Sequence, residues 1–266
     1  MSWDFFQLKH EQKMPRYHIE VCTDANMGSE KFISGFIHDW FDQLPSNLHP
    51  DRFGKEQRVR KTFADEGPEG AIKSWLDSKM PILIKKTRKP KIEASGFWWP
   101  TKDLDSSIAK LRFPWEYSIL LDISAGDESA LCLMRFLINH LNPAFGSICS
   151  YEDKREKHLD IFPRTLPDGR EVEVSQWAGA VPGKTLPGIY WTTYFGPWAL
   201  EKIGRDKCAN LCVPKCEPIN NGLLVVAYQG FSKIDRVDAR RAEKEIVRLL
   251  GKQKFFDLET WQPPED

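Results

Sequence analysis

Two adjacent segments in the middle of the chain constrain the fold most. Residues 117–123 read YSILLDI, and this continuous apolar character is typical of a buried strand. We expect Asp127 to cap the next helix, at residues 128–141, which is apolar nearly all round and should therefore be central. Asn142-Pro143 ends that helix, and another strand is expected at 145–151. The middle of the chain therefore predicts the core of a fold that contains both strands and helices.

The flanking segments add strands and helices in an irregular order. The pattern predicts strands at 16–23, 92–99, 188–195 and 223–228, and helices at 32–44, around 72–76, and at 104–111, 197–203 and 235–250. Because strands and helices do not alternate regularly, we expect an α+β fold, with a mixed or antiparallel sheet and amphipathic helices packed on it. One compact domain over 1–266 is expected, with irregular regions at 45–67 and 152–187.

The composition disfavours two classes of protein. Lys plus Arg and Asp plus Glu each number 38, so the formal net charge is zero, whereas nucleic-acid binders usually carry a basic excess. The longest apolar stretch, 130–138, is interrupted by Arg135 and is too short to span a bilayer. The first residues show no secretory signal, and six cysteines do not form a secreted disulfide pattern. We therefore expect a cytoplasmic protein that binds neither nucleic acid nor membranes.

A basic stretch from Lys79 to Lys91 contains no acid. One interpretation is an exposed sheet edge that lysines protect from unwanted strand pairing. The other is a contact patch for an acidic partner surface.

Several partial catalytic motifs are incomplete. Residues 179–185, GAVPGKT, resemble a phosphate-binding loop, but only three residues separate the glycines and Pro182 removes an amide donor. His10-Glu11 lacks the second histidine of a zinc-protease helix. Cys208, Cys212 and Cys216 are spaced every four residues without an evident fourth ligand. We expect neither a metal nor a cofactor.

The best enzymatic alternative is a metal-dependent nuclease. Asp122 ends a buried strand, and Glu152 and Lys154 follow another, so the three side chains could hold Mg²⁺ and orient water. The competing interpretation is a charged loop, EDKREK, beside a carboxylate that caps a turn.

The most specific feature lies at residues 188–204, GIYWTTYFGPWALEKIG. This segment resembles the signature of the bacterial immunity protein 52 family and of the related type VI immunity family. The residues that carry the resemblance are Gly188, Tyr190, Trp191, Tyr194, Phe195, Gly196, Pro197 and Gly204. The resemblance implies a non-catalytic protein that binds and neutralises a cognate toxin delivered by a type VI secretion system. It further implies that this toxin is a nuclease with a restriction-endonuclease fold.

The residue pattern of the same segment favours a structural role. Alternation places Ile189, Trp191, Thr193 and Phe195 on one face of the expected strand, which we take as the core face. Gly188 and Gly196 permit turns at its ends, and Pro197 can begin a helix. The segment is therefore expected to be scaffold, and the toxin contacts should lie elsewhere.

The surroundings of a nuclease active site are basic, so its inhibitor should present acidic side chains and aromatic anchors. The candidates are Asp65, Glu66, Glu69, Glu152, Asp153, Glu171, Glu173 and Trp177. The alternatives to an immunity protein are the nuclease above and a non-catalytic adaptor or scaffold.

Overall fold

The structure is a computed structural model that describes residues 15–55, 59–78, 82–98, 117–165, 169–177, 185–231 and 234–260. Its main feature is a ten-stranded sheet in the order β11-β12-β10-β7-β1-β6-β5-β4-β2-β3, in which every pair of neighbours is antiparallel. Together with the helices packed on this sheet, it gives the α+β domain that the sequence predicts.

The strands of the large sheet are β1 (Arg16–Thr23), β2 (Arg52–Gly54), β3 (Lys61–Thr62), β4 (Leu83–Lys86), β5 (Lys91–Trp98), β6 (Tyr117–Ser124), β7 (Phe145–Cys149), β10 (Thr192–Phe195), β11 (Lys215–Ile219) and β12 (Gly222–Val226). A separate two-stranded sheet consists of β8 (Leu159–Thr165) and β9 (Glu171–Trp177). The helices are α1 (Glu30–Gln43), α2 (Phe63–Ser78), α3 (Asp127–Leu141), α4 (Tyr151–His158), α5 (Pro197–Ile203), α6 (Arg205–Ala209) and α7 (Arg236–Leu250), with 3-10 turns η1 (Ser46–Leu48) and η2 (Lys252–Lys254).

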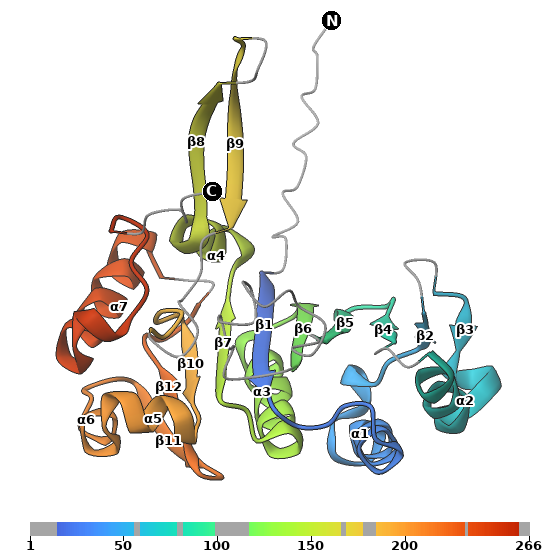
Figure 1. Cartoon of the computed structure of the whole chain (residues 1–266). Helices are drawn as coiled ribbons and strands as arrows, with labels where there is room; N and C mark the ends of the chain where they lie inside the picture. The colour runs from blue at the N-terminus through green and yellow to red at the C-terminus, as the bar shows by residue number, and fades with distance from the viewer. Residues whose placement is uncertain are drawn as a thin grey trace, which may run out of the picture.

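The large sheet has two chemically different faces. In Figure 1, α1, α2 and α3 lie below the sheet, whereas α4 and the β8–β9 hairpin rise from the other side, which we call the upper face. Cys216 of β11 shares that upper face with Glu20 through the strand register, and its thiol lies 3.5 Å from the carbonyl of Cys208, so α6 lies on the upper face as well. Residues paired directly across antiparallel strands point to the same face. In β1, Ile19 and Val21 point to the helix face, and His18 and Glu20 point to the upper face.

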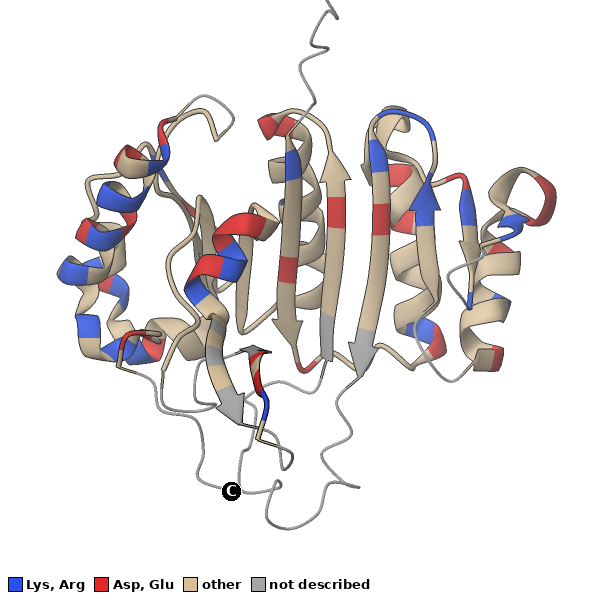
Figure 2. Cartoon of the chain, turned by 90° about the horizontal axis from the view of Figure 1, so that it is seen from above, with Lys and Arg blue, Asp and Glu red and all other residues tan. Residues whose placement is uncertain are grey.

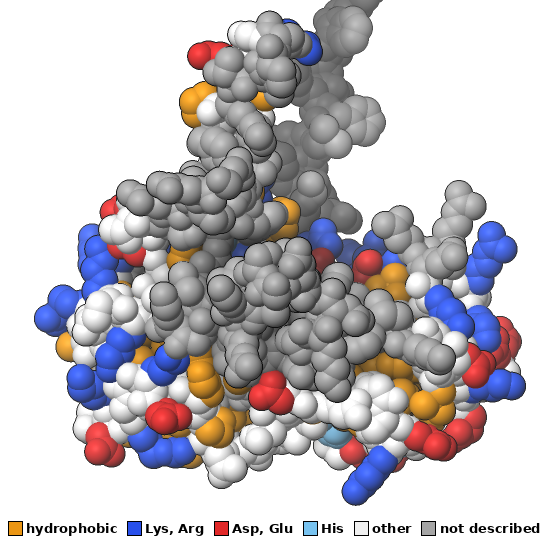
Figure 3. Space-filling view, in the orientation of Figure 1, with side chains coloured by type: hydrophobic (Ala, Val, Ile, Leu, Met, Phe, Trp, Pro, Cys, Tyr) orange, Lys and Arg blue, Asp and Glu red, His pale blue; other side chains and the backbone are white. Residues whose placement is uncertain are grey.

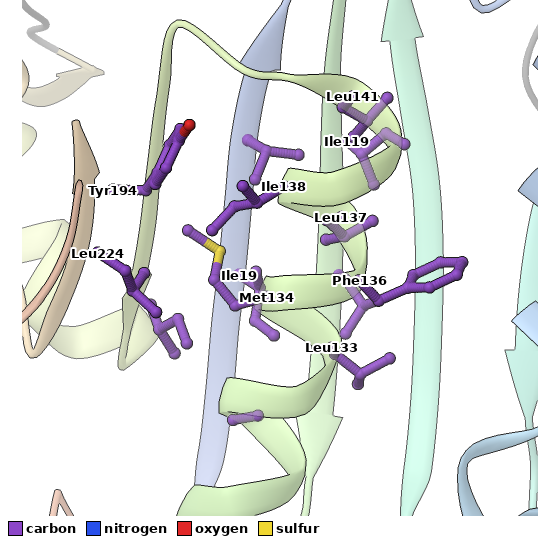
Figure 4. Close-up of a cluster of buried hydrophobic side chains, with 14 of the residues drawn as sticks. Ile19, Ile119, Leu133, Met134, Phe136, Leu137, Ile138, Leu141, Tyr194 and Leu224 are labelled. Carbon is purple, nitrogen blue, oxygen red and sulfur yellow. The ribbon is translucent and has the colours of Figure 1, made fainter. Parts of the chain in front are cut away.

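The centre of the core is the contact of α3 with β1 and β6 (Figure 4). Leu133, Met134, Leu137 and Ile138 of α3 are completely buried, as is Ile19 of β1. Burying one such side chain contributes about 2 kcal/mol, so α3 holds the middle of the sheet. The sequence prediction of a central helix at 128–141 is therefore confirmed.

Asp127 has a different role from the predicted helix cap. Gly126 is the N-cap of α3, and Asp127 is the first helical residue. Its carboxylate accepts a hydrogen bond from the hydroxyl of Tyr17 in β1 and another, at 3.1 Å, from the backbone N–H of Phe231. Asp127 thus ties the start of α3 to two distant parts of the chain.

Both regions that the sequence predicts to be irregular contain regular structure. The described residues of 45–67 include η1, β2, β3 and the start of α2. These strands have only three and two residues, too short for a readable alternation. Gly67, at φ +64°, separates the first turn of α2 from the amphipathic part that begins at Pro68. Residues 152–187 include α4, β8 and β9, and Gly169, at φ +83°, lies between these two strands.

Two further predictions need correction. The basic stretch 79–91 does not form a sheet edge, because β4 lies between β5 and β2. The strand predicted at 188–195 is limited to Thr192–Phe195, and all four of its residues are buried, so both of its faces are covered. The helix predicted at 104–111, the incomplete zinc motif at 10–11 and residues 179–184 of the incomplete phosphate-loop motif lie outside the described residues.

The close approach at Gly196 predicts a specific stability defect. A Cβ atom there would overlap the carbonyl oxygen of Pro143 and would lie 2.8 Å from that of Ala144. Because both obstacles are backbone atoms, we expect Gly196→Ala to lower the free energy of unfolding by about 2 kcal/mol or more. Urea denaturation measures the change.

Gly35 is the matched control for this substitution. It lies within α1, and a Cβ atom there would meet nothing within 4 Å. Since alanine is the better helix former, Gly35→Ala should raise stability by up to about 1 kcal/mol. Equal stability of the two variants would contradict the packing argument.

Candidate functional site

Helix α4 is attached to the upper face of the sheet by charged rather than apolar contacts. Ser150 caps its start, its hydroxyl accepting a 2.9 Å hydrogen bond from the N–H of Asp153. Lys154 reaches down to β1, where its ammonium group lies 2.7 Å from a carboxylate oxygen of Glu20 and 3.3 Å from Nε2 of His18. The helix has no apolar stripe, which explains why the sequence did not reveal it.

A second set of ion pairs joins α4 to α7. Lys157 lies 3.1 Å from the carboxylate of Asp153 in its own helix and 2.9 Å from that of Glu243 in α7. Arg240 of α7 pairs with both of these carboxylates and, at 2.8 Å, with Glu156. The side chain of Glu243 is only 5% exposed. A buried carboxylate is tolerated when cations surround it, as they do here.

These contacts change the proton affinities of the groups involved. Burial acts to raise the pKa of Glu20, but the adjacent Lys154 ammonium outweighs burial and holds that pKa below its usual value. Burial acts to lower the pKa of Lys154, and Glu20 reverses the effect, so the pKa is raised. Both groups are therefore charged at neutral pH. Burial raises the pKa of Glu243, and Lys157 counteracts only part of that shift.

The segment that carries the family resemblance supports α4 from below. Lys157 donates a 2.5 Å hydrogen bond to the carbonyl of Ile189 and lies 4.3 Å from the ring centroid of Tyr190. The hydroxyl of Tyr190 lies 2.6 Å from Nε2 of His158. Trp191 donates from its ring nitrogen to the carbonyl of Tyr228 at 3.0 Å.

Most of the signature residues are inaccessible. Gly188, Tyr190, Trp191, Tyr194, Phe195 and Gly196 are buried, Gly204 is half-buried, and Pro197 is exposed at the start of α5. A partner protein cannot reach the buried side chains without unfolding this part of the sheet. The arrangement fits a structural role for the segment.

The outward side of α4 continues into a projecting hairpin. Strands β8 and β9, which we call the arm, form a sheet of their own that extends away from the body (Figure 1). Hydrophobic, acidic and basic side chains are visible on the described part of the arm in Figure 3. Tyr151 and Ile161 are unusually exposed for apolar residues, at 51% and 56%. Glu152, Glu171 and Glu173 are also exposed. These five residues, on α4 and the arm, define what we call the arm surface.

The arm surface, as defined above, includes part of the predicted interface: Glu171 and Glu173 on the arm, and Glu152 at the start of α4. Asp153 is also a predicted contact, but it forms ion pairs with Lys157 and Arg240 within the protein. Trp177 ends β9, and its side chain lies outside the described residues. Tyr151 and Ile161 were not predicted. The Pro167-Asp168-Gly169 turn signal between two strand-like runs could have revealed the hairpin.

The remaining predicted contacts, Asp65, Glu66 and Glu69, lie on a different part of the molecule. Helix α2 packs at the β2–β3 end of the sheet, away from α4 (Figure 1). Asp65 accepts a 2.6 Å hydrogen bond from Thr62, Glu66 pairs with Lys61 at 2.9 Å, and Glu69 pairs with His38 at 3.1 Å. These carboxylates stabilise the start of α2 and its surroundings.

Only two of the three residues in the nuclease alternative lie near one another, because His18 contacts both Asp122 and Lys154. Asp122 pairs with Arg16 at 2.7 Å and with His18 at 3.0 Å, and Lys154 pairs with Glu20. Glu152 is exposed, and a separation of two residues on a helix places it on the other side of α4 from Lys154. The structure therefore does not assemble the Asp, Glu and Lys side chains as one group.

The three cysteines with regular spacing differ in burial. Cys208 is buried, Cys216 is half-buried and Cys212 is exposed, and all are free thiols. Burial raises the pKa of the Cys208 and Cys216 thiols. Within the described ranges, no three His, Cys, Asp or Glu side chains are grouped so that they could hold a metal ion. In the same ranges, no helix combines the length and apolar character needed to cross a bilayer.

Comparison with known proteins relates the fold to one bacterial secretion protein. No protein-family model matches the chain, and no curated protein matches its sequence. The solved structure of the Pseudomonas aeruginosa T6SS protein PA0821 resembles this fold with a TM-score of 0.50 and 12% sequence identity. The match covers 91% of this chain and 73% of that chain. The likeness thus extends over almost the whole α+β domain.

The cluster between α4 and α7 predicts a large effect of removing one cation. Lys157→Ala leaves Asp153 and Glu243 with Arg240 alone and removes the donor to the Ile189 carbonyl. We expect the free energy of unfolding to fall by about 3 kcal/mol, because the buried carboxylates lose one of the two cations that balance their negative charge. Chemical denaturation measures this.

The control removes a cation from an exposed pair on helix α7. Arg241 pairs with Asp238 at 3.0 Å, and its side chain is 76% exposed. Arg241→Ala should change stability by less than about 1 kcal/mol. A similar small effect for Lys157→Ala would show that the α4–α7 cluster does not contribute to stability.

Proposed function

We propose that this protein is a bacterial immunity protein that binds and neutralises a cognate toxin of a type VI secretion system. The observation that carries the proposal is the likeness of its fold, over 91% of the chain, to a structure described as a T6SS protein. The resemblance of residues 188–204 to immunity-protein signatures supports the same conclusion independently. In this proposal the protein acts in the cytoplasm of the cell it protects, without a cofactor and without catalysis.

The arm surface is our proposed contact region for the toxin. A hairpin of two strands is marginally stable alone, so an arm that extends from the body gains stability when a partner covers it. Tyr151 and Ile161 supply the exposed apolar anchors, and Glu152, Glu171 and Glu173 supply negative charge. Aromatic anchors with surrounding charges are typical of binding hot spots.

The charge of the arm surface indicates the kind of site that it fits. A nuclease binds a polyanion, so the surroundings of its active site are basic. Carboxylates on a projecting hairpin can enter such a site, attract its cations and exclude the nucleic acid. We therefore propose occlusion of the active site of a nuclease toxin as the mode of neutralisation.

Co-expression tests the function directly. The toxin gene adjacent to the gene for this protein should stop growth when expressed alone in a heterologous host, and co-expression of this protein should restore growth. The two purified proteins should form a stable complex in gel filtration. No rescue and no complex would refute an immunity role and leave the adaptor alternative. Hydrolysis of DNA or RNA by the purified protein with Mg²⁺, lost in Glu152→Ala, would establish the enzyme instead.

Charge reversal on the arm tests the contact region. We expect Glu171→Lys combined with Glu173→Lys to weaken toxin binding by about tenfold or more, because two attractive charges become repulsive. Both side chains are exposed, so the thermal stability of the variant should not change. Isothermal titration calorimetry with a catalytically inactive toxin measures the affinity.

The matched control applies the same charge change on two helices away from the arm, α2 and α5. Asp77 of α2 and Glu201 of α5 are exposed and form no ion pair within the described residues. Asp77→Lys combined with Glu201→Lys should bind the toxin as the wild type does. If the arm variant also binds normally, the arm is not the contact region, although the immunity function would stand.

A further inference from the structure

A second surface, of opposite charge, is formed around the loop between β4 and β5. Residues 85–91 read KKTRKPK, five cations in seven residues without an acid. Figure 2 shows this loop in blue at one end of the sheet, with a further cation at the same end of β1. Lys86 and Lys91 line a hollow of about 410 Å³ together with Arg16 of β1. We call this loop and Arg16 the basic end.

The carboxylates next to the basic end already have partners. Asp51 accepts hydrogen bonds from the backbone N–H of Thr87, at 3.0 and 3.1 Å, and from its hydroxyl at 2.7 Å. Glu93 pairs with Lys85 at 3.2 Å. Asp122 is shared by Arg16 and His18. Asp51 keeps its negative charge, because Thr87 is neutral, but the five cations of the loop and Arg16 still outnumber these three acids.

Four cations remain without compensation among the described residues. Lys86, Arg88, Lys89 and Lys91 form no ion pair there, and all but the half-buried Lys86 are exposed. Like charges held this close repel one another, which destabilises the free protein. The chain as a whole has no net charge, so the excess is a local property of this end. A partner that supplies carboxylates would relieve the repulsion.

The loop is also held in place before any partner arrives. The bonds from Thr87 to Asp51 fix its first half, and β5 is paired along its length with β6 in the middle of the sheet. Strand β4 lies inside the sheet, so protection of an edge does not explain the lysines. A rigid charged surface loses little conformational entropy on binding, which favours recognition.

The hollow discriminates between two kinds of acidic partner. The side chains of Glu93 and Asp122, which also line it, are 52% and 33% exposed. These carboxylates repel a continuous row of phosphates. A protein surface, in which acids and bases alternate, can place its carboxylates on the lysines and its donors on Glu93. The mixed charge favours a protein over a nucleic acid.

We propose that the basic end is a second contact surface, which binds an acidic surface of the same toxin that the arm engages. This inference rests on the immunity function proposed above. The two surfaces differ in charge and lie on different strands, so the partner must present a basic region and an acidic region. Contact at both places would also fix the orientation of the toxin.

The test reverses three cations that have no ion-pair partner within the described residues. Lys86→Glu, Arg88→Glu and Lys91→Glu are combined, and binding to the inactive toxin encoded by the adjacent gene is followed by stopped-flow fluorescence. We expect association to slow by about tenfold or more at low ionic strength. The difference should shrink as salt is added, because the interaction is screened. In the wild-type complex, a zero-length carbodiimide should join lysines of the loop to aspartate or glutamate of the toxin.

The control reverses three exposed lysines on α1, α2 and α7. It combines Lys31→Glu, Lys73→Glu and Lys244→Glu, so its net charge changes by the same amount as that of the loop variant. It should associate at nearly the wild-type rate. Thermal unfolding of both variants establishes that they are folded.

The outcomes separate this inference from the proposed function. If the toxin binds and is neutralised but the loop variant associates like the control, the basic end is not a contact surface, and the immunity function stands. If a short DNA duplex binds the wild type and the loop variant loses that binding, the surface recognises phosphates and our inference is wrong. If the wild type does not bind the toxin, the proposed function and this inference both fall.

Discussion

The packing of α3 against the middle of the large sheet is the contact on which the rest of the structure depends. It buries the helix face of β1 and β6 and fixes the orientation of the sheet. Thr23 at the end of β1 donates a 2.6 Å hydrogen bond to the carbonyl of Leu141. At the other end of α3, the carboxylate of Asp127 accepts a hydrogen bond from the hydroxyl of Tyr17. Both ends of α3 are thus tied to β1, so the strand and the helix form one unit.

This unit leaves the upper face of β1 with a different chemistry. Because side chains alternate along a strand, burying Ile19 and Val21 on one side places His18 and Glu20 on the other. A carboxylate in that position needs a cation, and Lys154 of α4 supplies it. The helix that lies above the sheet is therefore polar, and its position depends on ion pairs. The arm begins where this helix ends, so the ion pairs also determine where the arm lies.

Sequence patterns reveal elements that bury an apolar face and miss those held by charge. The segments at 117–123 and 128–141 are predicted because a long apolar run in a protein of this composition belongs in the core. Helix α4 is missed since the side chains that attach it are polar and find their partners on other elements. The arm is missed since a pair of strands outside the core has no buried face to produce alternation. Of the predicted contacts, Glu171 and Glu173 lie on the arm, Glu152 lies at the start of α4 near α7, and Asp65, Glu66 and Glu69 stabilise a distant helix.

The neutral composition of the chain conceals an uneven distribution of charge. Equal numbers of acids and bases argue against a general affinity for polyanions, but they say nothing about where each charge lies. Ion pairs neutralise the region between α4 and α7. In contrast, within the described structure the arm carries carboxylates that belong to no ion pair, and the β4–β5 loop carries cations that belong to none. Two surfaces of opposite sign on a neutral molecule create a dipole. A dipole orients a partner of complementary charge before contact and repels one of the reverse arrangement, so it favours one partner without adding a general attraction.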